Sequence, residues 1–312
     1  MPSFAGYGKI PLGRCDASDP GGDWCVTEKV HGANFSVHLD RSGTIHCAKR
    51  TGFLKEHEDF FGHFEMLCSS RAKFLNLADD VFEHNTEITS VALFGELCGG
   101  KYPHPAVVET CHARPVQVGV WYSPSVEFIL FDIAATSHGT CTFMAFKSVV
   151  DLATKHKLLC VPVLLIGSRG LCANFDPKFE THVPSRFGLP AIPGNYAEGI
   201  VAKPWCQSTS MEERPILKIK THEFSEGVGS RPLPGDAGMR DYLLSQVNGN
   251  RLDAAASKVG HVTDRNNWSE IVDHVMEDIL QEVGEDTTFL AMQAQLRCET
   301  FDLLVAQQGK DS

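Results

Sequence analysis

Short segments rich in β-favouring residues, bounded by turn signals, fill the N-terminal three-quarters of the chain. They predict strands at 24–30, 34–39, 44–49, 91–97, 126–133, 199–202 and 215–220. Two longer segments, 58–77 and 143–157, carry apolar residues three to four positions apart and predict helices. The pattern therefore predicts an N-terminal region of mixed strands and helices.

The pattern changes after a Gly/Pro-rich segment that runs from Gly227 to Gly235. Beyond it, apolar residues recur at helical spacing in stretches that extend as far as Val305. We therefore expect a domain at 1–227, a linker at 228–235 and a small all-helical domain at 236–312. A chain of 312 residues with 43% hydrophobic residues is large enough for two domains with their own cores.

Charge is distributed unevenly along the chain, whose net charge is −11. Residues 231–312 hold 7 Lys+Arg against 14 Asp+Glu, a balance of −7, and the first 230 hold 21 against 25, a balance of −4. This argues against a protein that coats nucleic acid through a broad positive field. A nucleic-acid or nucleotide site must be a local cluster, which we expect in the N-terminal domain.

Compartment and membrane association are indicated by cysteine usage and by hydropathy. The 11 cysteines are scattered without a C-x-x-C pair, which favours a reducing intracellular compartment over a zinc site or a disulfide framework. The sequence has neither a membrane-spanning apolar run nor the apolar core of a signal peptide at its start. We expect no membrane association and a cytoplasmic location by default, with an organelle or phage origin left open.

The segment with the clearest chemical potential is Glu28-Lys-Val-His-Gly-Ala-Asn34. Its lysine ends a predicted strand and is followed by a glycine turn, so the amine could act as a nucleophile where a phosphate can approach. Taken alone, Lys29 is more often a surface residue of a hairpin. Five further segments change this balance: 48–52, 93–97, 128–133, 197–204 and 215–220. In the last of these, strand alternation places Lys218 and Lys220 on one face.

This ordered set resembles the covalent nucleotidyltransferases, and within them the RNA ligase 2 family. The more specific signals are His31, where related ligases and capping enzymes usually have Asp, and segments 47–52, 58–62 and 224–226. The resemblance continues through segments 250–252, 257–260 and 277–280, so it covers nearly the whole chain. It implies an α+β fold with a nucleotidyltransferase (ATP-grasp-like) domain of antiparallel sheets and helices, followed by a small all-helical domain.

By this resemblance, Lys29 is the nucleophile that carries AMP from ATP. Lys218 and Lys220 would bind the α-phosphate, and Glu198 would bind Mg²⁺, with Mn²⁺ as a possible substitute. Asn34 could hold metal-bound water. The arrangement makes chemical sense because a lysine amine, with a pKa of about 10.4 in water, is a poor nucleophile until nearby cations lower that value. The same cations would stabilise charge on the α-phosphate.

The other matched positions concern the nucleoside and the support of the site. Glu28 and Val30 would flank the adenine, and Phe131 would stack on it. Arg50 and Glu96 would contact the ribose or orient the nucleotide. Supporting or phosphate-contacting roles fall to Tyr7, His31, Asp132 and Lys203. Each of these residues alone could be a core, turn or strand-edge residue, but the expected chemistry needs them in one site.

The expected activity is ATP-dependent RNA joining in three steps: lysyl-AMP formation, transfer of AMP to an RNA 5′-phosphate, and attack by a 3′-OH. Nicks in double-stranded RNA are the expected substrate, in RNA repair or editing, and a monomer is the expected state. In the helical domain, phosphate contacts would rest on Arg240, Arg251 and Lys258. The alternatives are a ligase for DNA or RNA–DNA hybrids, a capping enzyme, and a catalytically silent RNA-binding scaffold.

A zinc site is disfavoured, because Cys111-His112 and His46-Cys47 lack a second pair at zinc-ligand spacing.

Overall fold

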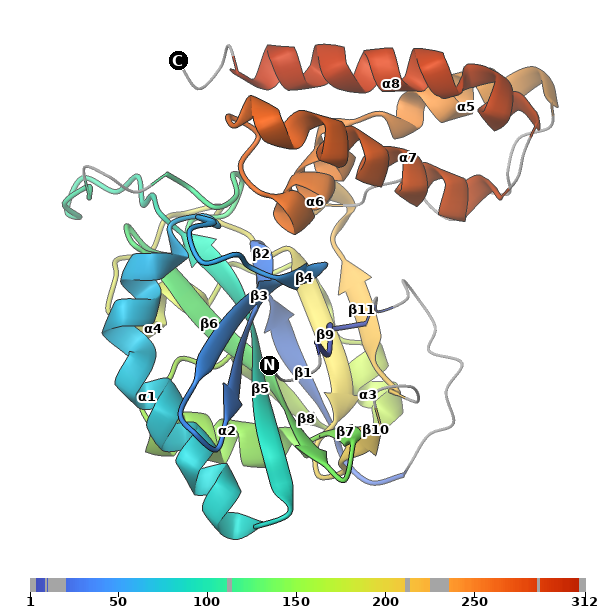
Figure 1. The fold of residues 1–312 in the computed structure, drawn as a ribbon. Helices are drawn as coiled ribbons and strands as arrows, with labels where there is room; N and C mark the ends of the chain where they lie inside the picture. The colour runs from blue at the N-terminus through green and yellow to red at the C-terminus, as the bar shows by residue number, and fades with distance from the viewer. Residues whose placement is uncertain are drawn as a thin grey trace. The chain divides into compact units, whose positions relative to one another are not determined.

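The computed structural model describes residues 4–8, 10, 21–110, 114–210, 214–224, 236–284 and 287–308. The chain divides into two compact units, Met1–Thr221 and His222–Ser312 (Figure 1). The expected linker at 228–235 lies outside the described residues, so its boundaries stay a prediction. Among the described residues, no helix combines the length and apolarity that a bilayer crossing requires.

The first unit contains two antiparallel sheets. The smaller sheet has the order β11 (Leu217–Lys220), β9 (Gly199–Pro204), β1 (Trp24–Lys29) and β8 (Val163–Gly167). The larger sheet has the order β10 (Thr209–Ser210), β7 (Thr140–Phe143), β6 (Val126–Ser137), β5 (Ile88–Gly99), β2 (Ala33–Asp40), β3 (Ile45–Lys49) and β4 (Gly52–Phe53). The helices of this unit are α1 (His63–His84), α2 (Phe146–Lys155), α3 (Arg169–Ala173) and α4 (Val183–Arg186). The short 3-10 turn η1 (His222–Phe224) follows the unit in sequence. These elements confirm the predicted α+β fold with antiparallel sheets.

Strand alternation gives the smaller sheet one apolar and one cationic face. Trp24 and Val26 of β1 pack with Ile200 and Ala202 of β9 in a buried cluster. The intervening residues point to the opposite face, which carries Lys29 at the end of β1. Burial of the apolar face therefore fixes which side chains of these strands remain available for chemistry.

Helix α1 begins and ends later than the periodicity predicts, at 63–84 instead of 58–77. The residues before it form a turn in which Phe61 and Gly62 have φ of 54° and 72°. The Asp59 carboxylate accepts the N–H of Gly62 at 3.1 Å, which stabilises that turn. The apolar residues Phe60 and Phe61 thus belong to a turn that the helical spacing could not distinguish from a first helical turn.

The second unit is helical, as the resemblance implies. It contains α5 (Asp236–Gln246), α6 (Gly249–Val259), α7 (Trp268–Val283) and α8 (Thr287–Gln308), with the 3-10 turn η2 (Arg265–Asn267) before α7. Its core is a single cluster that includes Leu243, Leu252, Ile271 and Leu296, each fully buried. The Asn248 side chain caps α6 by accepting the N–H of Arg251 at 3.0 Å.

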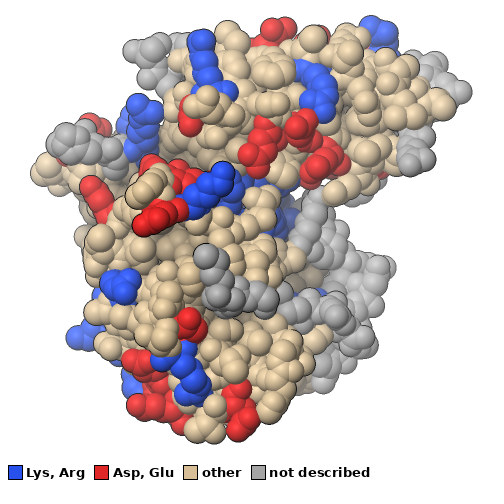
Figure 2. Space-filling view, viewed as in Figure 1, with Lys and Arg blue, Asp and Glu red and all other residues tan. Residues whose placement is uncertain are grey.

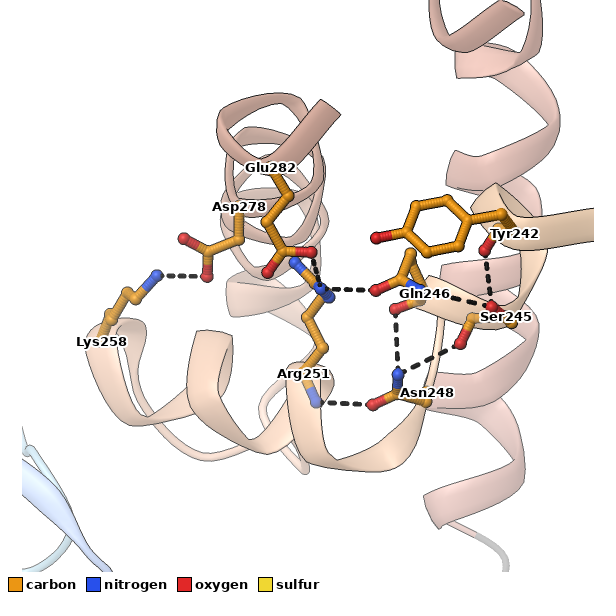
Figure 3. Close-up of polar contacts among 8 residues, drawn as sticks. All are labelled: Tyr242, Ser245, Gln246, Asn248, Arg251, Lys258, Asp278 and Glu282. Carbon is orange, nitrogen blue, oxygen red and sulfur yellow. Dashed lines mark hydrogen bonds and ion pairs between the residues drawn. The ribbon is translucent and has the colours of Figure 1, made fainter. Parts of the chain in front are cut away.

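A buried arginine ties three of these helices together (Figure 3). Arg251 has no exposed surface, and its Nη2 donates to Gln246 Oε1 at 2.9 Å and to Glu282 Oε2 at 2.7 Å. Lys258 pairs with Asp278 at 2.8 Å, and Arg240 is exposed and donates to Gln295. The expectation that Arg251 contacts RNA phosphates is wrong for this structure, because its guanidinium is enclosed and engaged within the helical unit.

Candidate active site

Three strands of the smaller sheet bring two of the predicted lysines beside the predicted metal-site carboxylate. Lys29 at the end of β1 lies opposite Gly199 of β9, which in turn lies opposite Lys220 of β11. Glu198 directly precedes β9, and its Oε2 contacts the Nζ of Lys29 while its Oε1 lies 3.1 Å from the Nζ of Lys220. The Nδ1 of His31 is 3.6 Å from the same Oε2.

The close approach of the strands at this point depends on glycine. A Cβ at Gly199 would run into the main-chain carbonyl of Ile219, and the residue has a φ of 152°. Any side chain there would push β11, and with it Lys220, away from β9. Glycine thus holds Lys220 within reach of Glu198.

The two carboxyl groups of the site have opposite pKa shifts. Burial alone would raise the pKa of Glu198, but the ammonium groups of Lys29 and Lys220 lower it well below its usual range. Burial raises the pKa of Glu96 to about 7; Lys29 opposes this shift and the Glu198 carboxylate adds to it. Glu198 is therefore a permanent anion between cations, whereas Glu96 titrates close to neutral pH.

Strands β2 and β5 place further predicted residues next to Glu96. Asn34 of β2 lies directly opposite Glu96 of β5, so both side chains project from the same face of the larger sheet. Arg50 lies in the turn after β3, and its charge lowers the pKa of Glu96. The structure therefore gathers the predicted residues of the ribose and metal sides of the site around Glu96.

A tyrosine that the sequence analysis did not single out supports the turn that follows Lys29. The N–H of His31 donates to the hydroxyl of Tyr122 at 2.8 Å, and Tyr122 is buried. Asn195 anchors the neighbouring main chain, because its side-chain amide exchanges two hydrogen bonds with the backbone of Trp121, at 2.9 and 2.7 Å. Trp121 and Tyr122 are thus part of the wall of the site.

Glu28 lies on the other face of β1 from Lys29. Its carboxylate accepts hydrogen bonds from the Thr181 hydroxyl and, at 2.9 Å, from the N–H of His182. Val30 is also buried. In this structure the Glu28 side chain is therefore committed to residues 181–182, so an adenine contact by Glu28 would have to be made from that side of the strand.

Glu28 predicts a pH-dependent stability. Burial raises its pKa to about 7, against the lowering effect of the Thr181 and His182 hydrogen bonds. Between about pH 4.5 and 7 the folded chain then holds a proton that the unfolded chain has lost, so stability must fall as pH rises. In denaturant titrations at about pH 5.5 and 7.5, Glu28→Gln should remove roughly 2 kcal/mol of the wild-type pH difference.

The control for this measurement is Glu65→Gln, at an exposed position of α1. It removes a carboxyl group without touching the Glu28 contacts, so the pH difference of the wild type should persist. If Glu28→Gln and Glu65→Gln give the same pH dependence, the Glu28 carboxyl does not titrate in this range.

On the lysine-bearing side of the smaller sheet, where Lys203 of β9 projects, Asp132 of β6 accepts three hydrogen bonds on one oxygen. Its Oδ2 lies 2.6 Å from the Tyr7 hydroxyl, 3.1 Å from Lys203 Nζ and 2.6 Å from Arg214 Nη2. Burial would raise the pKa of Asp132, but Arg214 and Lys203 lower it below its usual value. The structure thus joins Tyr7, Asp132 and Lys203, which were predicted to support the site, and adds Arg214, which was not.

This cluster contacts the predicted stacking residue. Pairing between β5 and β6 passes from Phe94–Asp132 to Gly95–Leu130, so Phe131 is the extra residue of a β-bulge. Bulges re-aim side chains, and here the bulge frees Phe131 from the regular alternation of the strand. Its carbonyl accepts Lys203 Nζ at 2.6 Å, and its ring packs edge-to-face on Tyr7 at 4.9 Å.

The oxygen donors near Lys29 fit a hard divalent cation. Mg²⁺ is commonly held by one or two carboxylates together with water and substrate phosphates. Glu198 supplies such a carboxylate and Asn34 an amide oxygen for bound water, and among the described residues no set of three His, Cys, Asp or Glu ligands forms an all-protein cage. Cys111-His112 lies outside the described residues.

Comparison with known proteins finds relatives among RNA ligases. RNA-editing ligase 2, mitochondrial, from Trypanosoma brucei brucei is 31% identical over 201 residues, covering 58% of this chain and 48% of the relative. RNA-editing ligase 1, mitochondrial, from the same organism is 29% identical over 302 residues, covering 76% of this chain and 64% of the relative. The chain therefore spans about half to just under two thirds of the length of these curated relatives.

Two solved structures of RNA ligases have low similarity to this chain. A Naegleria gruberi RNA ligase with PPi is 14% identical with a TM-score of 0.41, over 73% of this chain and 62% of that one. An archaeal ATP-dependent RNA ligase is 16% identical with a TM-score of 0.39, over 97% of this chain and 65% of that one. Two family models match directly: "RNA ligase" over residues 22–220 and "T4 RNA ligase 2 C-terminal" over residues 239–307. Because these models cover most of the sequence, the chain belongs to the RNA ligase family, in its RNA ligase 2 branch.

Proposed function

We propose that this chain is an ATP-dependent RNA ligase that forms a lysyl-AMP intermediate on Lys29. The observation that carries the proposal is the contact of Lys29 with Glu198. The Glu198 carboxylate also pairs with Lys220, where the neighbouring strands β1, β9 and β11 place these residues side by side. A rigid amine beside a second cation and a charged carboxylate is the arrangement that attack on a nucleoside triphosphate requires. Family membership supports the same reaction class.

In the first step, the deprotonated Lys29 amine attacks the α-phosphorus of ATP. A P–N bond forms, the bond from the α-phosphorus to the bridging oxygen breaks, and pyrophosphate leaves with the electron pair. The Lys29 proton is released to solvent. Lys218 and Lys220 project from the face of β11 that adjoins Lys29, where they can neutralise the α-phosphate oxygens. AMP then passes to an RNA 5′-phosphate, and a 3′-OH displaces it to join the strands.

Glu198 has to change partners during this cycle. In the structure its carboxylate pairs with the Lys29 amine. A bound Mg²⁺ or Mn²⁺ would offset the negative charge of the triphosphate and of the leaving pyrophosphate. The residues that would hold it are Glu198 and, through water, Asn34. Glu198 would then no longer pair with Lys29 alone, and the amine would be released to attack the α-phosphorus.

The nucleoside would bind against Phe131, with Arg50 and Glu96 at the ribose. The bulge at Phe131 and the Tyr7–Asp132–Lys203 cluster support this role, because Tyr7 packs against the Phe131 ring and Lys203 donates to the Phe131 carbonyl. Every group that the chemistry needs lies in one chain, so a single protomer is expected to complete one cycle.

Free thiols at nine described cysteines favour a reducing compartment, whether cytoplasm or the organelle to which the names of both relatives refer.

Nicked double-stranded RNA is the proposed substrate. On the face drawn in Figure 2, lysine and arginine side chains of the first unit stand in small groups beside acidic ones, which does not suit sequence-independent coating of nucleic acid. A substrate positioned by a few contacts and by A-form geometry suits such a surface better. RNA engagement by the helical unit would rest on exposed residues such as Arg240.

A side-by-side joining assay tests this assignment. Nicked duplex RNA, nicked duplex DNA and single-stranded RNA of matched sequence are incubated with the protein, ATP and Mg²⁺. We expect nicked RNA to join at least about tenfold faster than the other two, a discrimination of roughly 1.4 kcal/mol. Equal joining of DNA would indicate a general polynucleotide ligase, preferred joining of single strands would contradict the duplex assignment, and RNA binding without joining would indicate a scaffold.

A further inference from the structure

Helix α8 carries apolar side chains on two opposite faces. One face holds Phe289, Met292, Leu296 and Leu304, which are buried in the core of the helical unit. The other carries the α8 stripe, defined as Leu290, Ala294, Cys298, Phe301 and Val305, all exposed. Successive members are four, four, three and four residues apart, which places them along one side of a helix.

The stripe is unusual within its own unit. In the described parts of residues 236–308, the large apolar residues that are exposed are Leu290 at 55%, Phe301 at 38% and Val305 at 57%, and all three belong to it. No charged residue interrupts the stripe, and Arg297 beside it is held by Asp273 of α7 at 2.6 Å. A continuous exposed apolar strip of about 22 Å on one helix is the kind of surface that another helix covers.

The order of residues along the stripe indicates which helix. Leu290 and Val305 are centred on the peptide bond between Arg297 and Cys298, and so are Ala294 and Phe301. Two copies of α8 packed antiparallel about a two-fold axis at that bond would therefore set Leu290 against Val305 and Ala294 against Phe301. The small alanine leaves room for the large phenylalanine, as close helix packing requires.

Charges beside the stripe agree with the same symmetry. Asp302 and Gln295 are two turns apart on one flank of α8, and Gln295 accepts a hydrogen bond from Arg240 at 3.0 Å. The two-fold axis carries Asp302 of one chain to the level of residue 293 in the second copy, beside the second copy's Arg240. The flank thus places opposite charges together across the contact.

We propose that the α8 stripe is a self-association surface, through which two copies of this chain pair by an antiparallel contact of their α8 helices. Such an interface is isologous, since the same patch faces itself. A single helix pair is at the low end of interface sizes, so the dimer is expected to be reversible, with a Kd of roughly 1–100 µM. This state differs from the monomer that the sequence analysis expects, and it is independent of the ligase assignment.

Paired substitutions test the contact and its direction. By sedimentation equilibrium over a concentration series, Val305→Glu and Leu290→Lys should each weaken dimerisation at least about tenfold, because each buries a charge against an apolar residue. The double variant Leu290→Lys/Val305→Glu should restore dimerisation, since residue 290 of one copy faces residue 305 of the other. The matched control Gln293→Glu, exposed but off the stripe, should leave the dimer unchanged. Thermal melts of each variant verify that the fold is intact.

Cys298 gives an independent readout near the two-fold axis. Helix axes about 8–10 Å apart bring the two Cys298 residues within disulfide reach, so mild oxidation should give a cross-linked dimer that Cys298→Ser does not form. Three outcomes would overturn the proposal: a wild type that stays monomeric up to about 200 µM, single variants that dimerise like wild type, or a double variant that stays monomeric. The last outcome would assign the stripe to a different partner or a different direction of packing.

Discussion

Lys29→Ala is expected to reduce strand joining by at least about 10³-fold, to the background of the assay. Lys220 cannot take over, because the β9–β11 register holds it at the other carboxylate oxygen of Glu198. Loss of a nucleophile removes the intermediate itself, so excess ATP or Mg²⁺ should not restore the rate. The measurement is single-turnover joining of nicked RNA by the purified variant.

The matched control is Lys147→Ala. Lys147 is exposed on α2 and pairs with Asp151 four residues later, an arrangement worth only a few tenths of a kcal/mol. Its removal should leave joining unchanged. If Lys29→Ala supplied with pre-adenylylated RNA still sealed it, the defect would be assigned to the first step; if Lys29→Ala joined ordinary RNA with ATP at the wild-type rate, Lys29 would not be the nucleophile.

Asp132→Ala is expected to destabilise the first unit by about 3–5 kcal/mol. The substitution leaves the buried Lys203 and Arg214 without their common carboxylate, and the Tyr7 hydroxyl without its acceptor. The buried cations also lie over aromatic rings, with Phe146 at 3.9 Å from Lys203 and Phe143 at 3.4 Å from Arg214, but such rings cannot replace an anion. For a unit of this size, Tm should fall by roughly 10 °C.

Asp151→Ala is the control for this prediction, since it removes an exposed carboxylate from a surface pair. It should change stability by less than about 0.5 kcal/mol. Asp132→Asn keeps one acceptor oxygen and should fall between the two. A Tm for Asp132→Ala within about 2 °C of wild type would show that Asp132 does not hold the cluster together.

Much of the site could be predicted because strand alternation and motif order agree. A lysine at a strand end, a carboxylate before a glycine, and two lysines spaced by two positions must share a face if their strands are neighbours, and β1, β9 and β11 are neighbours. The pairing itself is not visible in a single sequence. The resemblance supplied the roles of these residues, and the structure supplies the pairing of their strands.

Other residues could not be predicted, for reasons specific to each. Arg214 has no motif around it, and its role depends on a 2.6 Å contact with a residue 82 positions away. Tyr122 lies in a segment without periodicity and reaches His31 only through the tertiary fold. Arg251 read as a surface cation because sequence spacing does not reveal that Gln246 and Glu282 accept its hydrogen bonds inside a helical core.

The account rests on one covalent event, and intact-mass spectrometry measures it directly. The purified protein is first treated with pyrophosphate, which removes any AMP already attached, and is then incubated with ATP and Mg²⁺ beside Lys29→Ala. The account predicts that the wild type gains the mass of one AMP and that Lys29→Ala gains none. A wild type that gains no mass with ATP, or a Lys29→Ala variant that gains as much as the wild type, would contradict it.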